Sequence, residues 1–286
     1  MSHGSAAGHK ISSTSTGHAM SDAGWLDLHF AVARAEYVAM IRSVGILPGH
    51  QVLDAGCGCG SFLPLIGELV GKNGAIAALD LAPENVATVR QRLAAEPLPC
   101  RVEVREGSIL RLPYADCSFD VVWCANVVQY LEIAEFAQVA AEFHRVLKRG
   151  GVLALKEMEM TAFQVTPLPP PIMWHLLESQ RQNNRHVGGM HTLSFPQWLR
   201  TAGFSDLVLK TYIGEDRHPL SQEQADLIRG VLAVHATLAA EATELAPDEK
   251  NVWQTLVGDF SHPKNVMNDP DFYFRRPYAL VLGRKP

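Results

Sequence analysis

Hydrophobic positions along the first half of the chain switch repeatedly between two spacings. Short apolar runs of strand length occupy 52–55, 75–80, 101–108, 119–126 and 152–159. Apolar residues recur at helical spacing in 21–44, 62–70, 84–95 and 136–147. This alternation predicts a doubly wound parallel sheet, whose ligands bind beyond the carboxyl ends of the strands. The fourth run is apolar almost throughout, so we expect it to be buried on both faces.

The alternation is interrupted after residue 157. The remaining patterns are a proline-punctuated segment that turns helical, a helix at 196–204, a strand at 206–214, helices at 221–245 and 251–260, and an alternating segment at 272–286 that is typical of an edge strand. The sheet therefore carries two insertions, one after its fifth strand and one before its last. Because both leave from the expected ligand edge, we interpret them as a cap over the strand ends rather than as packing additions.

The composition of the chain limits the kinds of partner that we expect it to bind. The 286 residues are 47% apolar, enough for one large domain, and the formal net charge is −5 with acids and bases interspersed. A nucleic-acid partner is disfavoured, because duplex-binding proteins usually carry a clustered basic face. No apolar run reaches signal-peptide or membrane-span length, so we expect a cytoplasmic protein without a membrane partner. The five cysteines are expected to be reduced thiols, and no metal site is expected.

The segment VLDAGCGCGSF, at 52–62, carries the strongest chemical signal. An apolar strand runs into an acid and then into three glycines, which let the backbone turn tightly and let a ligand approach the main chain. A helix that begins at Phe62 would point its first N–H groups into the same space and favour a negative group there. The loop predicts a nucleotide-like cofactor, and several such cofactors would fit it.

Two common cofactor motifs match this loop poorly. In the dinucleotide fingerprint G-x-G-x-x-G, Gly56 and Gly58 match, but Ser61 stands at the third glycine position. The Gly-Lys-Ser/Thr end of a phosphate-binding Walker loop is absent from the segment. Asp80, at the end of the second strand, suits the ribose hydroxyls of any nucleoside cofactor. The loop spacing therefore argues against NAD and ATP as cofactors. It does not identify which other nucleoside cofactor binds.

Four segments in succession carry a family resemblance. They are VLDAGCGCGSF, ALDLAPENV, EGSILRLPYADCSFDVVWCANVVQYL and EFHRVLKRGGVLALKE. In this order they resemble the motifs of class I S-adenosylmethionine-dependent methyltransferases, most closely those of the ubiquinone/menaquinone-type small-molecule branch. The resemblance implies an α/β, Rossmann-like doubly wound sheet of about seven strands, the last one antiparallel, with a helical cap from the N-terminus and the insertions. It also implies S-adenosylmethionine as the cofactor.

The resemblance assigns cofactor-binding roles by position. The implied cofactor-binding residues are Asp54, Gly56, Cys57, Gly58, Gly60, Asp80, Leu81, Ser108, Ile109 and Asn126. Asp54, the glycine turn and Asn126 would face the methionine part, Asp80 would hold the ribose hydroxyls, and Leu81 would lie against adenine. Ser108 stands where family members often have an aspartate that accepts from the adenine amino group. A neutral serine should be the weaker partner there.

Pattern and resemblance together divide the chain into seven segments. They are a disordered tail (1–20), an N-terminal lid helix (21–45), a cofactor-binding core (46–157), a cap insertion (158–195), a core helix and strand (196–216), a second helical cap insertion (217–270) and a final core strand (271–286). The tail is expected from its Ser, Gly, His and Ala content.

The implied reaction is an in-line displacement, in which the protein mainly aligns the methyl donor with the acceptor. A general base is needed only where the acceptor must lose a proton. We expect Glu157 or His191 in that role, from a wider set of candidates that also holds His29, Tyr37, Glu159, His175 and His186. The acceptor is expected to be a small apolar or aromatic metabolite, plausibly of secondary metabolism. Whether carbon, oxygen or nitrogen is methylated stays open, as does homo-oligomer formation.

Two alternatives compete with this function. A nucleic-acid methyltransferase would usually carry an Asn/Asp-Pro-Pro-Tyr-like motif after the fourth strand, and CANVVQYL lacks it. A protein that binds S-adenosylmethionine but performs other chemistry, such as a cyclase, or that only binds the ligand, would share every motif. The sequence leaves this second alternative open.

Overall fold

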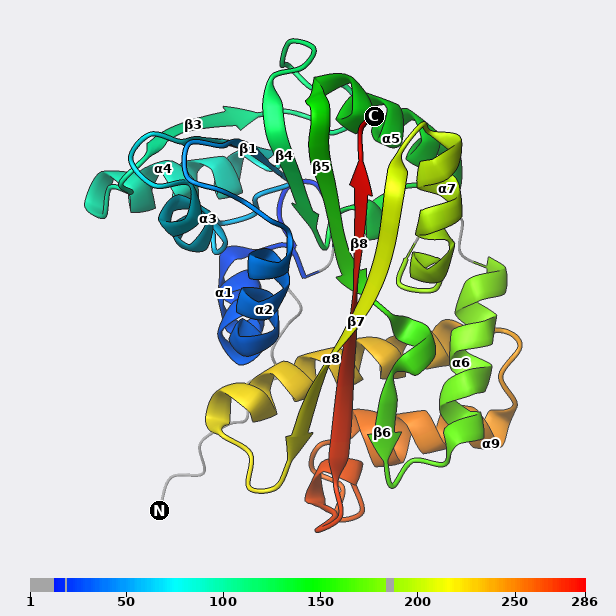
Figure 1. Ribbon diagram of the computed structural model, residues 1–286. Coiled ribbons are helices and arrows are strands. Elements are labelled where there is room, and N and C mark those ends of the chain that lie inside the picture. The colour runs from blue at the N-terminus through cyan, green and yellow to red at the C-terminus, as the bar shows by residue number, and fades with distance from the viewer. Residues whose placement is uncertain (1–12, 19, 184–187) are drawn as a thin grey trace.

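The computed structural model describes residues 13–18, 20–183 and 188–286, which form a mixed eight-stranded sheet with helices on both faces (Figure 1). The strands are β1 (Gln51–Ala55), β2 (Ala75–Asp80), β3 (Arg101–Glu106), β4 (Phe119–Ala125), β5 (Leu147–Met158), β6 (Gln164–Thr166), β7 (Ser205–Arg217) and β8 (Tyr273–Arg284). The helices are α1 (Ala23–Val32), α2 (Arg34–Ser43), α3 (Leu63–Val70), α4 (Pro83–Ala95), α5 (Phe136–Val146), α6 (Pro170–Asn183), α7 (Phe195–Thr201), α8 (Gln222–Glu241) and α9 (Pro247–Val252), which a π-helical turn, Trp253–Gly258, continues. Short 3₁₀ turns lie at Val128–Tyr130, Ile133–Glu135, Met160–Ala162, Thr192–Ser194 and Val266–Asn268.

The sheet topology confirms the predicted Rossmann-like fold. The strand order is β3-β2-β1-β4-β5-β8, and both β6 and β7 pair with β8. Strands β1 to β5 are parallel, whereas β8 runs antiparallel to β5, β6 and β7. The short β6 raises the number of strands to eight, one more than the sequence indicated. Three residues are too few to leave a readable alternation.

Two apolar layers enclose the sheet. Helices α5 and α7 pack on one face, and α2, α3 and α4 pack on the other. Strand β4 supplies both layers, since Val121, Val122, Trp123 and Cys124 are each at most 1% exposed. This confirms the expectation that the fourth strand is buried on both faces.

Helices also gather at the carboxyl ends of β4 and β5. Figure 1 shows α1, α2 and α8 beyond these strand ends, with α6 and α9 continuing the same layer. A third apolar cluster joins α6, α8, the π-helical turn and β6. Segments from the N-terminus and from both insertions therefore lie where a ligand of such a sheet would bind.

The single helix expected over 21–44 is wrong, because the chain forms two helices there. Ala33, with φ −94° and ψ 13°, ends α1 and precedes α2. None of the residues of α1 is buried, whereas α2 buries Tyr37, Met40 and Ile41 in the layer beneath it. The two helices pack on different surfaces, so their apolar residues do not lie along one face of a single continuous helix.

The final strand is an interior strand and not the expected edge strand. β8 pairs with β7 along one side and with β5 and then β6 along the other. Its residues from Arg276 to Val281 are all buried, which is the continuous burial of a strand covered on both faces. Only the first few residues of β8 alternate, and that part suggested an edge.

Part of the segment predicted as a tail, 1–20, lies among the described residues. Residues 1–12 and 19 lie outside the described residues, but 13–18 contact the domain. The Ser15 amide and hydroxyl both donate to the Glu84 carboxylate of α4, and the His18 ring stacks on Tyr130 at 4.6 Å between centroids. The helix expected at 251–260 is likewise different, since it consists of the end of α9 and the π-helical turn.

Candidate functional site

The glycine loop after β1 turns sharply beneath the loop that follows β4. Gly56, Gly58 and Gly60 have φ of +79°, +55° and +85°, values that L side chains rarely adopt. The Gly56 and Cys57 amides donate to the Leu79 carbonyl at 2.7 and 2.9 Å, which ties the loop to β2. A Cβ on Gly56 would collide with the Val127 side chain. The loop therefore requires glycine for its conformation and its close packing.

Asp80 holds the glycine loop from the end of β2. Its Oδ2 accepts from the Gly58 amide at 2.7 Å, and its Oδ1 accepts from the Ala82 amide at 2.9 Å and from Asn85 Nδ2 at 3.3 Å. A carboxylate offers about four lone-pair sites, so Asp80 retains capacity for further hydroxyl donors. Leu81 follows it with 51% of its surface exposed.

Asp54 is a buried carboxyl group at the end of β1. It is 1% exposed, and within the described part of the chain its Oδ2 has no hydrogen-bond partner. Burial, with a smaller contribution from the Asp80 charge, raises the pKa of Asp54 to about 8. A cation placed beside Oδ2 would supply the missing partner and stabilise the ionised form.

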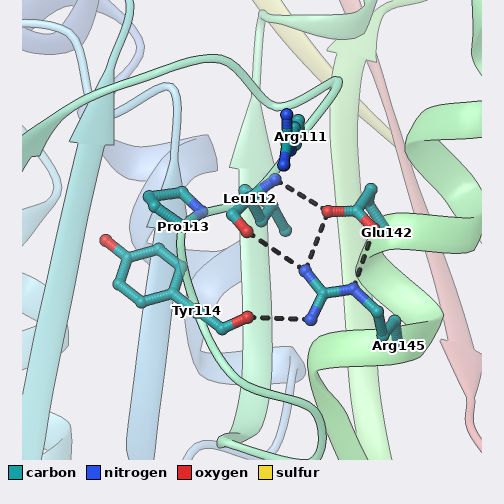
Figure 2. Close-up of a pocket in the computed structure, with 6 residues that line it drawn as sticks. All are labelled: Arg111, Leu112, Pro113, Tyr114, Glu142 and Arg145. Carbon is teal, nitrogen blue, oxygen red and sulfur yellow. Dashed lines mark hydrogen bonds and ion pairs between the residues drawn. The ribbon is translucent and has the colours of Figure 1, made fainter.

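The loop after β3 places Ser108 and Ile109 at the same edge of the sheet. Ser108 Oγ accepts from the Leu110 amide at 3.2 Å, and Ile109 is 8% exposed. Figure 2 shows how the rest of this loop is held, around a pocket of about 600 Å³. Glu142 accepts from the Leu112 amide, and Arg145 donates to the carbonyls of Leu112 and Tyr114 and to Glu142.

Glu142 and Arg145 of this pocket bind each other and the backbone of the loop. Arg145 also pairs with Asp116 at 2.9 Å, so its guanidinium is engaged with α5 and with the loop. The pocket therefore anchors residues 110–116 to α5 and, through them, the loop that carries Ser108. We assign it a structural role.

A second polar group lies at the ends of β4 and β5. Asn126, which has φ +58°, accepts at Oδ1 from Lys156 Nζ at 2.5 Å and donates from Nδ2 to the Tyr37 hydroxyl at 3.4 Å. Lys156 Nζ also donates to the Tyr37 hydroxyl at 3.1 Å. Lys156 Nζ lies over the rings of Tyr37 and Tyr278, at 4.6 and 4.3 Å from their centroids.

This second group extends from α1 to β7. The Tyr37 hydroxyl is 3.2 Å from His29 Nδ1, and the Tyr278 hydroxyl accepts from Arg276 Nη1 at 2.8 Å. Arg276 forms a buried ion pair with Asp216 of β7, with Nε 2.7 Å from Oδ2. Burial lowers the pKa of His29 well below its usual value, and the charges of Lys156 and Arg276 lower it further. Its imidazole is therefore neutral at pH 7.

The comparisons with known proteins agree on the family of this core. Residues 52–151 match the methyltransferase domain family. A demethylmenaquinone methyltransferase of Alkalihalophilus pseudofirmus is 31% identical over 125 residues, which are 44% of this chain and 52% of that protein. The methyltransferase GfsG of Streptomyces halstedii is 32% identical over 180 residues, 63% of this chain and 61% of that protein. The core is a class I S-adenosylmethionine-dependent methyltransferase domain.

The sequence matches cover only part of the chain, whereas the fold match covers most of it. The chain spans about half the length of the curated relatives it matches. A putative methyltransferase from Bacillus halodurans has the same fold with a TM-score of 0.57, covering 88% of this chain and 99% of that one at 18% identity. That likeness shows the fold alone.

S-adenosylmethionine is the methyl donor of this domain family, and the residues present fit it. The unpartnered Oδ2 of Asp54 suits the ammonium group of the methionine part. The glycine loop brings its backbone next to that carboxyl group, and Asp80 can accept from ribose hydroxyls. The structure thus gathers Asp54, the glycine loop, Asp80, Ser108 and Asn126 at one edge of the methyltransferase domain. Their individual contacts with the cofactor remain predictions.

The two predicted general bases lie on different elements. Glu157 is 0% exposed on β5, and its Oε1 accepts from the Val127 and Val128 amides at 2.8 and 2.9 Å. Its Oε2 has no partner among the residues described, and burial raises its pKa. His191 caps the Thr192–Ser194 turn, 5.7 Å from the Trp198 ring between centroids. The role of general base stays a prediction for both residues.

The wider set of base candidates separates in space. Glu159 accepts from the hydroxyls of Thr161 and Thr192, and His175, on the exposed side of α6, pairs with Glu249. His186 lies outside the described residues. Only His29 and Tyr37 join the group around Lys156.

Sequence reasoning missed Lys156. The only signal was a lysine inside the otherwise apolar run VLALKEME, on a strand expected to end at the ligand edge. Such a lysine is either exposed on an edge strand or buried with partners. The hydrophobic pattern of the strand does not distinguish these two cases.

Within 13–18, 20–183 and 188–286, no three His, Cys, Asp or Glu side chains are arranged to hold a metal ion. All five cysteines are free thiols, as predicted. In the same described ranges, no helix has the length and apolar character needed to cross a membrane.

Proposed function

We propose that this protein transfers the methyl group of S-adenosylmethionine to a small-molecule acceptor held between the sheet edge and the helical cap. The single observation that carries the proposal is the buried, unpartnered Asp54 carboxyl beside the glycine loop of a methyltransferase domain. S-adenosylmethionine, when bound, supplies an electrophilic methyl group on a positively charged sulfur. The role of the chain is then to bind and orient the two reactants and to exclude water.

The proposal includes an apolar or aromatic acceptor. Several large apolar residues of the two insertions are used in folding. Met173 and Trp253 pack in the cap core, and Phe195 packs against the sheet. The rings of Phe30 and Phe62 instead pack against Tyr37, and Tyr37 packs against Tyr278 beside the Lys156 amine. These rings support a flat acceptor. A place in secondary metabolism is part of the same proposal.

Isothermal titration with S-adenosylmethionine, S-adenosylhomocysteine and NAD tests the cofactor, and release of S-adenosylhomocysteine with an acceptor panel tests the transfer. Binding of the first two ligands and not of NAD is expected. Cofactor binding without methyl transfer to any acceptor would favour the alternative, a protein that uses the ligand for other chemistry such as cyclisation.

Replacing Asp80 by alanine should weaken S-adenosylmethionine binding by about 1.5–3 kcal/mol, the range for hydrogen bonds to a charged group. The variant loses both the ribose acceptor and the Gly58 amide contact that shapes the loop. Isothermal titration measures the change. Asp116→Ala, an acid of the neighbouring loop with 74% side-chain exposure, is the control and should bind normally. Equal affinities of the two variants would show that Asp80 does not contact the ribose.

The affinity for S-adenosylmethionine should rise with pH between about 6 and 7.5. Because the free protein holds Asp54 with a pKa near 8, pairing with the ligand ammonium requires loss of a proton. Proton linkage then gives up to about a tenfold gain in affinity per pH unit, until the ligand amine itself deprotonates. Titration in buffers of different ionisation enthalpy should detect close to one released proton at pH 7.

Asp54→Asn should flatten this pH dependence, and Asp120→Asn, at the opposite end of the strands, should retain it. The folded-state pKa of Asp54 lies above the ordinary value of 3.8, so its ionisation costs stability as the pH rises toward 8. The free Asn variant should therefore unfold at a higher temperature than the wild type at pH 8. A pH-independent affinity in the wild type would contradict the pairing of Asp54 with a cation.

A further inference from the structure

Lys156 is a buried amine that the cofactor site does not use. Its side chain is 0% exposed, and a lysine is rarely buried without a specific partner. The described contacts of Nζ are with Asn126 Oδ1, which can only accept, and with the Tyr37 hydroxyl. A neutral amine has two N–H bonds and one lone pair. These two contacts use the N–H bonds and leave the lone pair able to take a proton.

The order of the strands places Lys156 at the acceptor end of the site. Along the carboxyl edge, β2 presents Asp80, β1 presents Asp54, β4 is followed by Asn126 and β5 presents Lys156. Asp80 and Asp54 are the groups suited to the ribose and the ammonium group of the cofactor, and Asn126 is assigned to its methionine part. The next strand, β5, therefore remains for the methyl acceptor, and Lys156 is the titratable group that β5 presents on the face covered by α2.

The charges around Lys156 favour an anion beside it. The titratable groups that face it are His29 of α1, Tyr37 of α2, Tyr278 and Arg276 of β8, and Glu157 of β5. Burial lowers the pKa of Lys156 to about 7, Glu157 opposes this effect, and Arg276 adds to it. Asp216 is already paired with Arg276. A newly protonated Lys156 would therefore be stabilised by an oxyanion and destabilised by a second cation.

We infer, on the basis of the proposed function, that Lys156 accepts the hydroxyl proton of the methyl acceptor, which is a phenol or an enol. The proton moves from oxygen to Nζ, and the oxyanion forms a bond to the methyl carbon. The carbon–sulfur bond breaks, and its electron pair goes to sulfur. The products are a methyl ether, S-adenosylhomocysteine and the Lys156 ammonium. An amine that arrives as an ammonium ion is disfavoured, because it would add a second cation to a region where the Arg276 charge already lowers the pKa of Lys156.

In the present arrangement His29 and Tyr37 cover Nζ. His29 is on α1, which has no buried residue, whereas Tyr37 is on the buried helix α2, so an acceptor would enter from the α1 side with Tyr37 kept in place. Tyr37 and the neutral His29 also form a hydrogen-bonded path along which the proton can leave Nζ after transfer.

The test measures S-adenosylhomocysteine release with a panel of phenols, 1,3-dicarbonyl enols and amines, for the wild type, Lys156→Met and Lys156→Arg. Transfer to at least one phenol or enol is expected, with kcat/KM rising as the pH passes about 7. Both variants should lose about 100-fold or more in this rate at pH 7.5, since arginine keeps the charge but does not accept a proton. Their affinities for S-adenosylmethionine should stay within about threefold of the wild type, and the residual rate should no longer follow pH.

Lys210→Met is the matched control. Lys210 lies in the same row of the sheet, since both lysines are in register with Leu280, but it is exposed on β7. The control should keep the wild-type rate and pH profile. Transfer to amines only, or a full rate in either Lys156 variant, would overturn this inference and leave the proposed function standing. Cofactor binding with no transfer to any compound would overturn both.

Discussion

Replacing Arg276 by methionine should destabilise the protein by about 3–5 kcal/mol, the usual cost of removing one partner from a buried ion pair. Arg276 and Asp216 are 4% and 1% exposed, and their side chains meet at 2.7 Å. Without the guanidinium, Asp216 keeps only the Gln224 amide, which donates at 2.8 Å, while its charge stays buried. The Tyr278 hydroxyl loses its donor as well. Urea unfolding with an unchanged m-value measures the loss.

Two further variants make this result specific. The double variant Arg276→Met/Asp216→Leu should recover most of the lost stability, because no unpaired charge remains. Arg181→Met breaks the pair with Glu178, in which both side chains are nearly half exposed, and should cost far less stability than Arg276→Met. If Arg276→Met costs no more than Arg181→Met, then water reaches Asp216 and the pair is not enclosed by β7, β8 and α8.

The cofactor edge could be predicted because its signals are local. The Asp-x-Gly-x-Gly-x-Gly turn follows a strand directly, and Asp80 ends the next strand, so strand order alone brings them together. The left-handed φ values of Gly56, Gly58 and Gly60 explain why the sequence needs glycine there. The same argument located Asn126, which follows β4, a strand that is apolar almost throughout.

The group around Lys156 was predicted only in part: His29 and Tyr37 were among the candidate bases, but the members of the group come from four distant parts of the chain. His29 and Tyr37 approach Lys156 only through the break at Ala33, which turns α1 away from α2. Tyr278 and Arg276 reach the site because β8 runs through the interior of the sheet, whereas its opening residues alternate like an edge strand. Each of these placements depends on tertiary packing, which overrides the local pattern.

The interior position of β8 also explains why the cap and the sheet act as one unit. β7 and β8 extend past the carboxyl end of β5, where β6 joins β8, and their far ends contact the cap. Asp216 near the end of β7 binds both Arg276 of β8 and Gln224 of α8. The cap helix α8 is therefore fixed to the strands that carry the aromatic rings near Lys156. By contrast, α1 contacts its surroundings through half-buried side chains such as Trp25 and Leu26, and none of its residues is fully buried.

Removal of residues 1–32 should reduce methyl transfer by about 100-fold or more while changing the affinity for S-adenosylmethionine much less. α1 lies on the glycine loop, since a Cβ at Gly58 would be 2.8 Å from Leu26 Cδ1, and Trp25 packs against Gly230 of α8. It thus bridges the loop and the cap over the strand ends. Its loss admits water and removes His29 from the acceptor end, and loss of alignment alone has an effect of this size. The cofactor groups all follow residue 50 and are retained.

The deletion stops at Val32 because α2 belongs to the core. Removing Tyr37, Met40 and Ile41 with it would unfold the layer that covers the sheet, so a loss of activity would then carry no information about a lid. Removal of residues 1–12 alone breaks none of the described contacts and serves as the control, with the wild-type rate expected. Hydrogen exchange of Trp25–Val32 should slow when S-adenosylhomocysteine is added, as the helix closes over the bound ligand. Full turnover without α1, or exchange that ignores the ligand, would show that this helix only packs on the loop, and the acceptor would then be enclosed by α8 and the segment around α6.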